Sequence, residues 1–107
     1  MKINRERMEE ALDYLSETCE IAARSKSYVD GMRQKGKTKK AMAFLEANGT
    51  VAERDAKSVT SKEFKKWTTD LENAVADSET YENKRKVEEL IVRTYQTISA
   101  NLRATNV

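Results

Sequence analysis

The chain has 107 residues, of which 38% are hydrophobic and 36% are charged, and it contains neither histidine nor proline. This composition excludes a thick globular core, and it is typical of a thin helical protein or of one that completes its core by self-association. The lack of histidine excludes Ser-His and Cys-His catalysis as well as histidine-containing zinc sites. Cys19 is the single cysteine, so an intrachain disulfide is excluded too.

No cationic segment followed by an apolar run opens the sequence, and no apolar run approaches the roughly 20 residues that span a bilayer. We therefore expect a cytoplasmic protein without membrane contact. No glycine-rich phosphate loop is present either. The sequence predicts no cofactor, no metal site and no small-molecule substrate.

The first expected element is a long helix over residues 4–47, which Asn4 caps and Asn48-Gly49 ends. Its larger apolar side chains recur in steps of four and three, which predicts a seam for a partner helix. The seam residues are Met8, Leu12, Leu15, Cys19, Ala22 and Val29, with Tyr14, Ile21 and Tyr28 in a second row beside them. On this seam Cys19 is expected to be a small buried thiol.

Two glycines leave the continuity of this first helix open. Gly31 and Gly36 each cost roughly 1 kcal/mol relative to alanine in a helix interior, and they lie beside a run of like charges. A break is therefore possible. The apolar pattern resumes at Ala41 and Phe44, which favours a continuous or kinked helix.

Two capping boxes, Thr50 to Glu53 and Thr60 to Glu63, follow one another. They predict a connector over residues 48–60 with a short helix at 51–58, and then a second long helix over residues 61–103. Val59 and Phe64 have the spacing of a hydrophobic staple around Thr60. In the second long helix we expect one seam register at Phe64, Trp67, Leu71, Ala74, Ser78 and Tyr81, and another at Val87, Ile91, Thr94, Ile98 and Leu102.

These elements predict an all-α fold in one domain, residues 1–107: a long antiparallel helical hairpin of coiled-coil type with a short helix in the connector. Each arm would be about 65 Å long. Equal arms imply that paired residue numbers sum to roughly 108, which places the polar run 82–86 opposite residues 24–27. The wide apolar face of the first arm also predicts a homodimer with a four-helix arrangement.

Charge is distributed unevenly along this pattern. Residues 33–66 carry ten Lys or Arg against four Asp or Glu. Folding of the hairpin would gather the ten at one end, where a phosphate backbone or an acidic protein could bind. The candidate binding residues are Arg33, Lys35, Lys37, Lys39, Lys40, Arg54, Lys57, Lys62, Lys65 and Lys66. A smaller patch is expected from Arg24, Lys26, Lys84, Arg85 and Lys86.

An acidic stripe on the first helix is the one candidate for enzyme chemistry. Its residues are Glu6, Glu10, Asp13, Glu17 and Glu20. Glu17 and Glu20 match the Glu-x-x-Glu pair of all-helical nucleotide pyrophosphatases, but no later Glu-x-x-Asp pair follows. We therefore interpret the stripe as a solvated acidic face and the protein as a non-enzyme, with a magnesium-dependent hydrolase as the distant alternative.

A resemblance to other proteins depends on three stretches: Phe44-Leu45-Glu46-Ala47-Asn48-Gly49-Thr50-Val51-Ala52-Glu53-Arg54, Asn83-Lys84-Arg85-Lys86 and Ser99-Ala100-Asn101-Leu102-Arg103. Together they resemble uncharacterised small all-helical bacteriophage proteins that are encoded near phage replication and recombination genes. The chain departs from their pattern at Gly31 and Gly36, and at Tyr95, where tryptophan is usual. The resemblance implies a phage origin, the cytoplasm of an infected bacterium and an accessory role near DNA metabolism. The leading hypothesis is contact with nucleic acid or a nucleic-acid-processing complex; the alternative is an inhibitor or adaptor that binds a host nuclease or a CRISPR-type defence complex.

Overall fold

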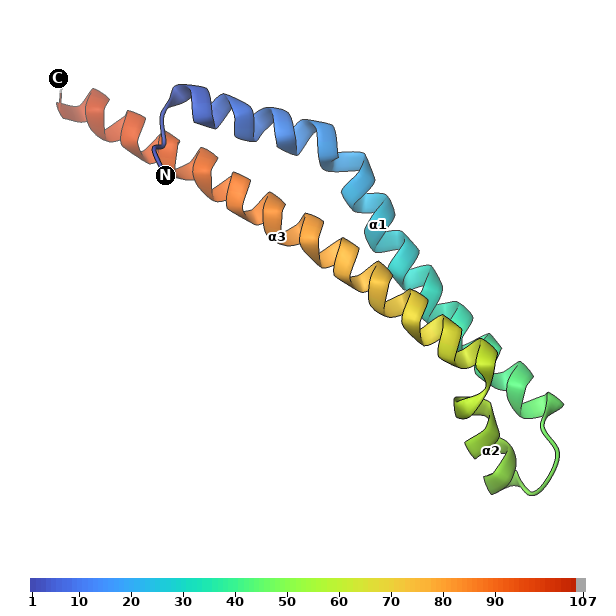
Figure 1. Cartoon of the computed structure of the whole chain (residues 1–107). Helices are drawn as coiled ribbons and strands as arrows, with labels where there is room; N and C mark the ends of the chain where they lie inside the picture. The colour runs from blue at the N-terminus through green and yellow to red at the C-terminus, as the bar shows by residue number, and fades with distance from the viewer. Residues whose placement is uncertain (106–107) are drawn as a thin grey trace. The chain divides into compact units, whose positions relative to one another are not determined.

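The computed structural model describes residues 1–105 of the chain. Three helices follow one another: α1 (Arg5–Glu46), α2 (Val51–Thr60) and α3 (Lys62–Thr105) (Figure 1). No strand occurs within residues 1–105. The predicted all-α class and the order of long, short and long helix are confirmed, and α1 continues without a break through both interior glycines.

The helices form two compact units. The central unit is Arg24–Ser78, and the terminal unit combines Met1–Ala23 with Glu79–Val107. Both α1 and α3 contribute a stretch to each unit. The single domain expected over residues 1–107 stays a prediction, and its residues 106 and 107 lie outside the described part.

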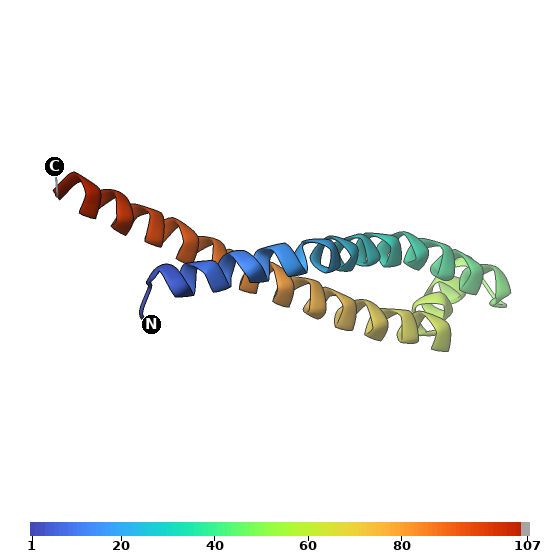
Figure 2. The same cartoon turned by 90° about the horizontal axis from the view of Figure 1, so that it is seen from above.

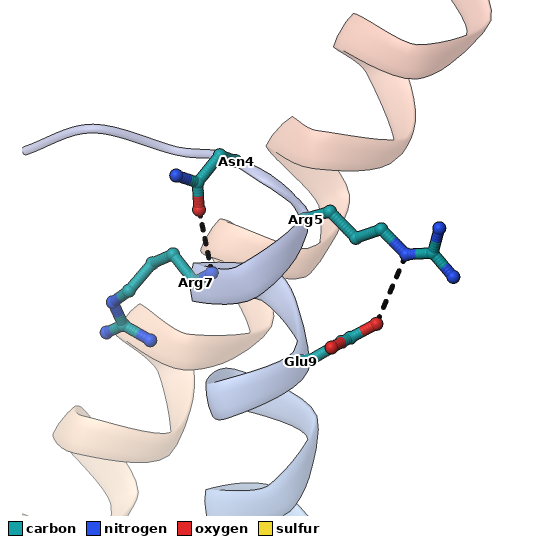
Figure 3. A network of polar contacts seen from close by, with 4 residues as sticks. All are labelled: Asn4, Arg5, Arg7 and Glu9. Atoms are coloured by element: carbon teal, nitrogen blue, oxygen red, sulfur yellow. Dashed lines mark hydrogen bonds and ion pairs between the residues drawn. The ribbon is translucent and has the colours of Figure 1, made fainter.

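Local capping explains where α1 and α2 begin. The Oδ1 atom of Asn4 accepts a hydrogen bond of 2.8 Å from the backbone N–H of Arg7, as Figure 3 shows. Thr50 caps α2 in the same way, since its Oγ1 accepts from the N–H of Glu53 at 3.2 Å. Between the two helices Gly49 has a φ of 118°, a left-handed conformation that favours glycine.

The cap of α3 differs from the prediction by one residue. Ser61, not Thr60, is the N-cap, and its Oγ accepts from the N–H of Phe64 at 3.2 Å. Thr60 still belongs to α2 and donates its hydroxyl back to the carbonyl of Ala56 at 3.0 Å. The staple expected around a Thr60 cap is therefore wrong, and Val59 is 41% exposed.

In the central unit, α1 and α3 pack through apolar and small residues. Val29, Met32 and Ala74 are buried, and Gly36 is buried beside them. The ring of Trp67 lies directly against Gly36, where any Cβ atom would collide with it. The indole N–H of Trp67 also donates to the carbonyl of Met32 at 2.7 Å. Gly36 thus allows the tryptophan to approach the α1 backbone.

In the terminal unit, polar groups lie between the same two helices. Ala11 and Ile91 are buried there. Arg7 donates to the carboxylate of Glu88 at 2.8 Å, and both side chains are largely shielded from solvent. Arg85 donates to the carbonyl of Leu15 at 2.8 Å and to the hydroxyl of Thr18 at 2.7 Å. The two helices are antiparallel here, because Arg7 contacts Glu88 whereas Leu15, which is later in α1, contacts Arg85, which is earlier in α3.

The expected pairing relation is wrong by several residues. Trp67 meets Met32, and Arg85 meets Leu15, so that paired numbers sum to about 100 and not to 108. The end of α1 explains this shift, because Phe44 and Leu45 line a hollow together with Ser58 of α2. Since α2 packs on the last turns of α1, α3 contacts residues of α1 that precede those turns in the sequence. The polar run 82–86 accordingly lies at the level of Leu15 and Thr18.

The predicted seams are confirmed only in part. The first register of α3 is confirmed, since all six of its residues are buried or half-buried. On α1 the prediction is wrong for several residues: Leu12, Ile21 and Tyr28 are 46%, 49% and 59% exposed, and Cys19 is exposed too. The seam of α1 instead follows Ala11, Leu15, Thr18, Ala22, Ser25, Val29, Met32 and Gly36. These positions keep the steps of four and three. The full seam was not predicted because five of its eight members are small or polar.

Candidate binding surface

All ten predicted bases belong to the central unit. Five lie on the second half of α1, two on α2 and three at the start of α3. The structure thus brings into one compact unit residues that are up to 33 positions apart in the sequence, from Arg33 to Lys66. They do not occupy one face, however, because the three helices present them in different directions.

Most of these bases are free cations. Nine of the ten are exposed; Arg54 is half-buried, and its Nε atom is buried without a hydrogen-bond partner. Arg33 lies 3.8 Å from the carboxylate of Asp30, and Lys57 donates to the carbonyl of Asn48 at 2.7 Å. The side-chain ammonium groups of the other seven make no ion pair or hydrogen bond with any residue of the described range: Lys35, Lys37, Lys39, Lys40, Lys62, Lys65 and Lys66.

The lysines of α1 flank two hollows. Lys37 and Lys40 border a hollow of about 460 Å³ that is lined by Phe44 and Leu45 of α1 and by Asp55 of α2. Lys39 borders a second hollow of about 200 Å³, whose lining includes Glu46 and Glu63. Both hollows therefore have lining residues of both charges, and the first has two lysines and one aspartate whereas the second has one lysine and two glutamates.

The lysines of α3 form a group that faces away from α1. Trp67 points toward α1, as its hydrogen bond to Met32 shows. At 100° per residue, Lys62 and Lys65 lie about 140° and about 160° from Trp67 around α3, and Lys66 lies about 100° from it on the adjoining flank. We call these three residues the outer lysine group. Their position leaves the ammonium groups open to a polyanion.

The aromatic residues near these bases are committed to packing. The rings of Phe64 and Trp67 lie 5.2 Å apart, and both residues are half-buried. The single indole donor of Trp67 is already bonded to Met32. Phe64 and Trp67 therefore provide no platform for stacking of nucleobases, which many single-strand-binding proteins use. Contact through this surface would be electrostatic.

The smaller predicted patch has a different environment. Lys84 lies over the ring of Tyr14 at 4.6 Å, and Lys86 pairs with Glu82 at 3.1 Å. Arg85 is bonded to Leu15 and Thr18 of α1. All three belong to the terminal unit and have intrachain partners, whereas Arg24 and Lys26 belong to the central unit. The five residues are therefore not brought together within either unit.

The acidic stripe of α1 is exposed throughout. Within residues 1–105 no three acidic, histidine or cysteine side chains are grouped as a metal site would require. The Arg7 guanidinium has its pKa raised above the usual value by the hydrogen bond to Glu88, an effect that burial opposes and the charges of Glu88 and Glu10 reinforce. It therefore stays charged far above neutral pH and serves the helix seam.

The apolar hollow beside Lys37 and Lys40 was not predicted from the sequence. A signal for it was present, because Ala41, Phe44 and Leu45 resume the apolar pattern of α1 next to an amphipathic short helix. The pattern was interpreted only as evidence that the first long helix continues. The hollow depends on α2, because Ser58 and Asp55 of α2 line it together with these residues.

No known protein family, curated protein or solved structure matches this chain. Within the described range no helix has both the length and the apolar character needed to cross a bilayer.

Proposed function

We propose that this chain is a non-enzymatic bacteriophage accessory protein that contacts nucleic acid, or a complex that processes it, in the cytoplasm of an infected bacterium. The contact surface consists of the ten bases of the central unit. The observation that carries the proposal is that the ammonium groups of seven exposed lysines there have no intrachain partner among the described residues. Unpaired cations in one unit repel each other unless a polyanion neutralises them.

Charge separates the two units and supports this proposal. The central unit has twelve Lys and Arg against eight Asp and Glu, whereas the terminal unit has eight against ten. A nucleic acid would thus be attracted to the central unit and repelled by the acidic stripe of the terminal unit. Such steering is long-ranged only at low ionic strength.

The test is a fluorescence anisotropy titration with labelled single-stranded and duplex DNA. We expect binding at about 50 mM salt and a fall in affinity of about a thousandfold at about 200 mM if some six phosphates are neutralised. No binding at tens of micromolar protein in low salt would reject direct nucleic-acid contact.

Two charge-matched variants locate the surface. The triple variant Lys62→Glu, Lys65→Glu and Lys66→Glu reverses the outer lysine group and should abolish binding. The control triple Lys2→Glu, Arg93→Glu and Arg103→Glu reverses three exposed bases of the terminal unit. It changes net charge equally and should retain most of the affinity. Equal losses in both variants would mean that only net charge matters.

A second candidate function has its own observation. The hollow of about 460 Å³ joins Lys37 and Lys40 to an apolar lining that includes Phe44 and Leu45. The phosphates of a nucleic acid would not bind to an apolar lining, whereas an acidic protein surface with a protruding apolar side chain could bury that side chain in the hollow. An inhibitor or adaptor that binds a host nuclease or a CRISPR-type defence complex would use this hollow.

A pull-down from nuclease-treated host lysate separates the two functions, because a protein target survives the nuclease. The variant Ala41→Gln places a larger side chain into the hollow and keeps helix propensity high. It should abolish protein capture and leave DNA binding unchanged. Capture that survives this variant would contradict the protein-binding hypothesis.

The chain is also proposed to be a homodimer. In support, its accessible surface of 8185 Å² exceeds by roughly 2,000 Å² the area of a compact monomer of its mass. A standard protein interface covers about 800 Å² on each partner. Light scattering that shows a monomer at micromolar concentration would reject the homodimer.

A further inference from the structure

The side of α3 that faces away from α1 in the central unit carries a row of cationic and small polar side chains. At about 100° per residue, the members of this row fall within one sector of the helix that is about 100° wide. The sector lies on the side of α3 away from Trp67, whose indole is bonded to α1. We call this set the outer row, and all its members are exposed: Lys62, Lys65, Lys66, Thr69, Asn73 and Ala76.

The outer row contains no acidic residue, although this stretch of α3 has several. Glu63, Asp70 and Glu72 lie outside the sector, at about 40°, about 60° and about 140° from Trp67 around the helix. The three ammonium groups of the row have no partner among the described residues. Positive potential is therefore concentrated on this side of α3.

The residue types of the outer row suit the oxygens of a phosphate backbone. A lysine binds a phosphate as a point charge, and threonine hydroxyl and asparagine amide groups are common donors to phosphate oxygens. Thr69 and Asn73 thus continue the row of donors beyond the lysines. The row has no aromatic ring on which an unpaired base could stack.

The row is also straight, because it belongs to one uninterrupted helix. Both views show this part of α3 as a continuous helix with α1 alongside it (Figures 1 and 2). From Lys62 to Ala76 the row is about 21 Å long. Duplex DNA carries a phosphate charge for every 1.7 Å or so of its axis, which is about twelve charges over that length. A single strand is flexible and is held largely by stacking, for which the row has no group.

We infer that the outer row binds the phosphate backbone of duplex DNA, and that it binds the duplex in preference to a single strand. This inference rests on the nucleic-acid contact proposed above and names its ligand class. It also adds Thr69 and Asn73 to the binding residues, which so far were bases only.

The ligand class is tested by fluorescence anisotropy with a duplex and a single strand of equal length. The natural chain should bind the duplex about tenfold more tightly at about 50 mM salt, because each neutralised phosphate of a duplex releases more counterion. A single strand that binds as tightly as the duplex would overturn the inference and leave nucleic-acid contact standing. Absence of binding to either would reject both.

The row itself is tested by adding a cation at its centre. Thr69→Lys should tighten duplex binding about tenfold at about 50 mM salt and steepen the slope of log affinity against log salt by about 0.9. Lysine is a better helix former than threonine, so the fold is not at risk. An unchanged slope would show that the row does not lie on phosphates.

Asn73→Glu is the opposite change further along the row. A carboxylate beside the phosphates should weaken duplex binding about tenfold at about 50 mM salt. Circular dichroism should be unchanged, because glutamate is also a good helix former.

Ser27→Lys and Ser27→Glu are the matched controls. Ser27 is an exposed residue of α1 in the same unit, and it lies at the level of Asn73 because paired numbers sum to about 100. It points away from the helix seam, since it is about 160° from the buried Val29 around α1. Both controls should change the affinity by less than about threefold, because exposed charges act weakly beyond a Debye length. Effects as large as those on α3 would mean that only net charge matters and would overturn the assigned row.

A competition experiment distinguishes the duplex from an acidic protein surface. Poly-glutamate should displace labelled duplex far less efficiently than unlabelled duplex does at the same concentration of charges, because its carboxylates are not held at fixed positions. Equal displacement would assign the outer row to acidic proteins and overturn the inference.

Discussion

Between α1 and α3 the central unit places Met32, Gly36 and Trp67, whereas the terminal unit places Arg7, Arg85 and Glu88 between the same two helices. The outer surfaces differ in charge, because the central unit exposes lysines whose ammonium groups have no partner among the described residues and the terminal unit exposes the acidic stripe of α1. The same two helices therefore pack through apolar contacts in the central unit, and through an ion pair and polar hydrogen bonds beside Ala11 and Ile91 in the terminal unit.

This difference shows how one heptad pattern can serve two purposes. An apolar seam is stabilised by burial and leaves the surface free for charge. A polar seam gains less from burial, because desolvation of an ion pair offsets much of its attraction. The ion pair of the terminal unit should therefore add less stability than the apolar contacts of the central unit.

The largest expected effect concerns the close approach in the central unit. Gly36→Ala would place a Cβ atom in the space of the Trp67 ring. We expect a loss of about 2 kcal/mol in the free energy of unfolding, since overpacking a helix interface outweighs the gain in helix propensity. Chemical denaturation followed by circular dichroism measures it.

Gly31→Ala is the control for this prediction. Gly31 lies on the same helix, and a Cβ atom there would have no neighbour within 4 Å. The variant should therefore stabilise the protein by about 1 kcal/mol through helix propensity alone. A stabilised Gly36→Ala would show that Trp67 does not pack against this glycine.

The polar seam of the terminal unit is tested by removing one or both partners. Arg7→Met leaves the Glu88 carboxylate shielded from solvent without its cation, and one of its oxygens is already buried without a hydrogen bond. We expect a lower melting temperature for this variant. The double variant Arg7→Met and Glu88→Leu should recover or exceed the natural value, because apolar residues replace buried ion pairs without desolvation cost. A double variant less stable than the single one would show that the pair stabilises this unit.

A smaller effect is expected for the indole hydrogen bond in the central unit. Trp67→Phe keeps an aromatic ring against Gly36 but removes the donor to the Met32 carbonyl. The expected loss is about 1.5 kcal/mol, which combines the hydrogen bond with the smaller ring volume. Native-state hydrogen exchange should show the decrease in the central unit. Unchanged protection there would mean that the hydrogen bond contributes nothing.

The sequence predicted the helices well because their signals are local. Asn4 and Thr50 accept hydrogen bonds within their own first turns, and Gly49 needs only its own backbone freedom. The ten bases could be grouped for the same reason, since they lie close to the connector in the sequence. Local signals of this kind do not depend on how the helices pair.

The seam of α1 could not be read from apolar residues. Large aliphatic residues such as Leu12 and Ile21 suggested one face, but small residues such as Ala11 and Gly36 determine how closely α3 approaches. Gly36 belongs to the seam because the ring of Trp67 lies against it, and Trp67 is 31 positions later in the chain. The apolar hollow was missed for a related reason, because it depends on α2 packing on the end of α1.

The helix caps provide the smallest test, because the two units should respond differently to the same kind of change. Ser61→Ala removes the cap of α3 inside the central unit and should lower the free energy of unfolding by about 1 kcal/mol. The neighbouring Thr60 only donates its hydroxyl back to Ala56 of α2, so Thr60→Ala should change the free energy of unfolding by less than about 0.5 kcal/mol. Asn4→Ala removes the same kind of bond at the start of α1. Its loss should be seen mainly as faster hydrogen exchange in the first turn, since a helix terminus frays without unfolding the remainder. If Thr60→Ala instead cost as much as Ser61→Ala, α3 would begin one residue earlier.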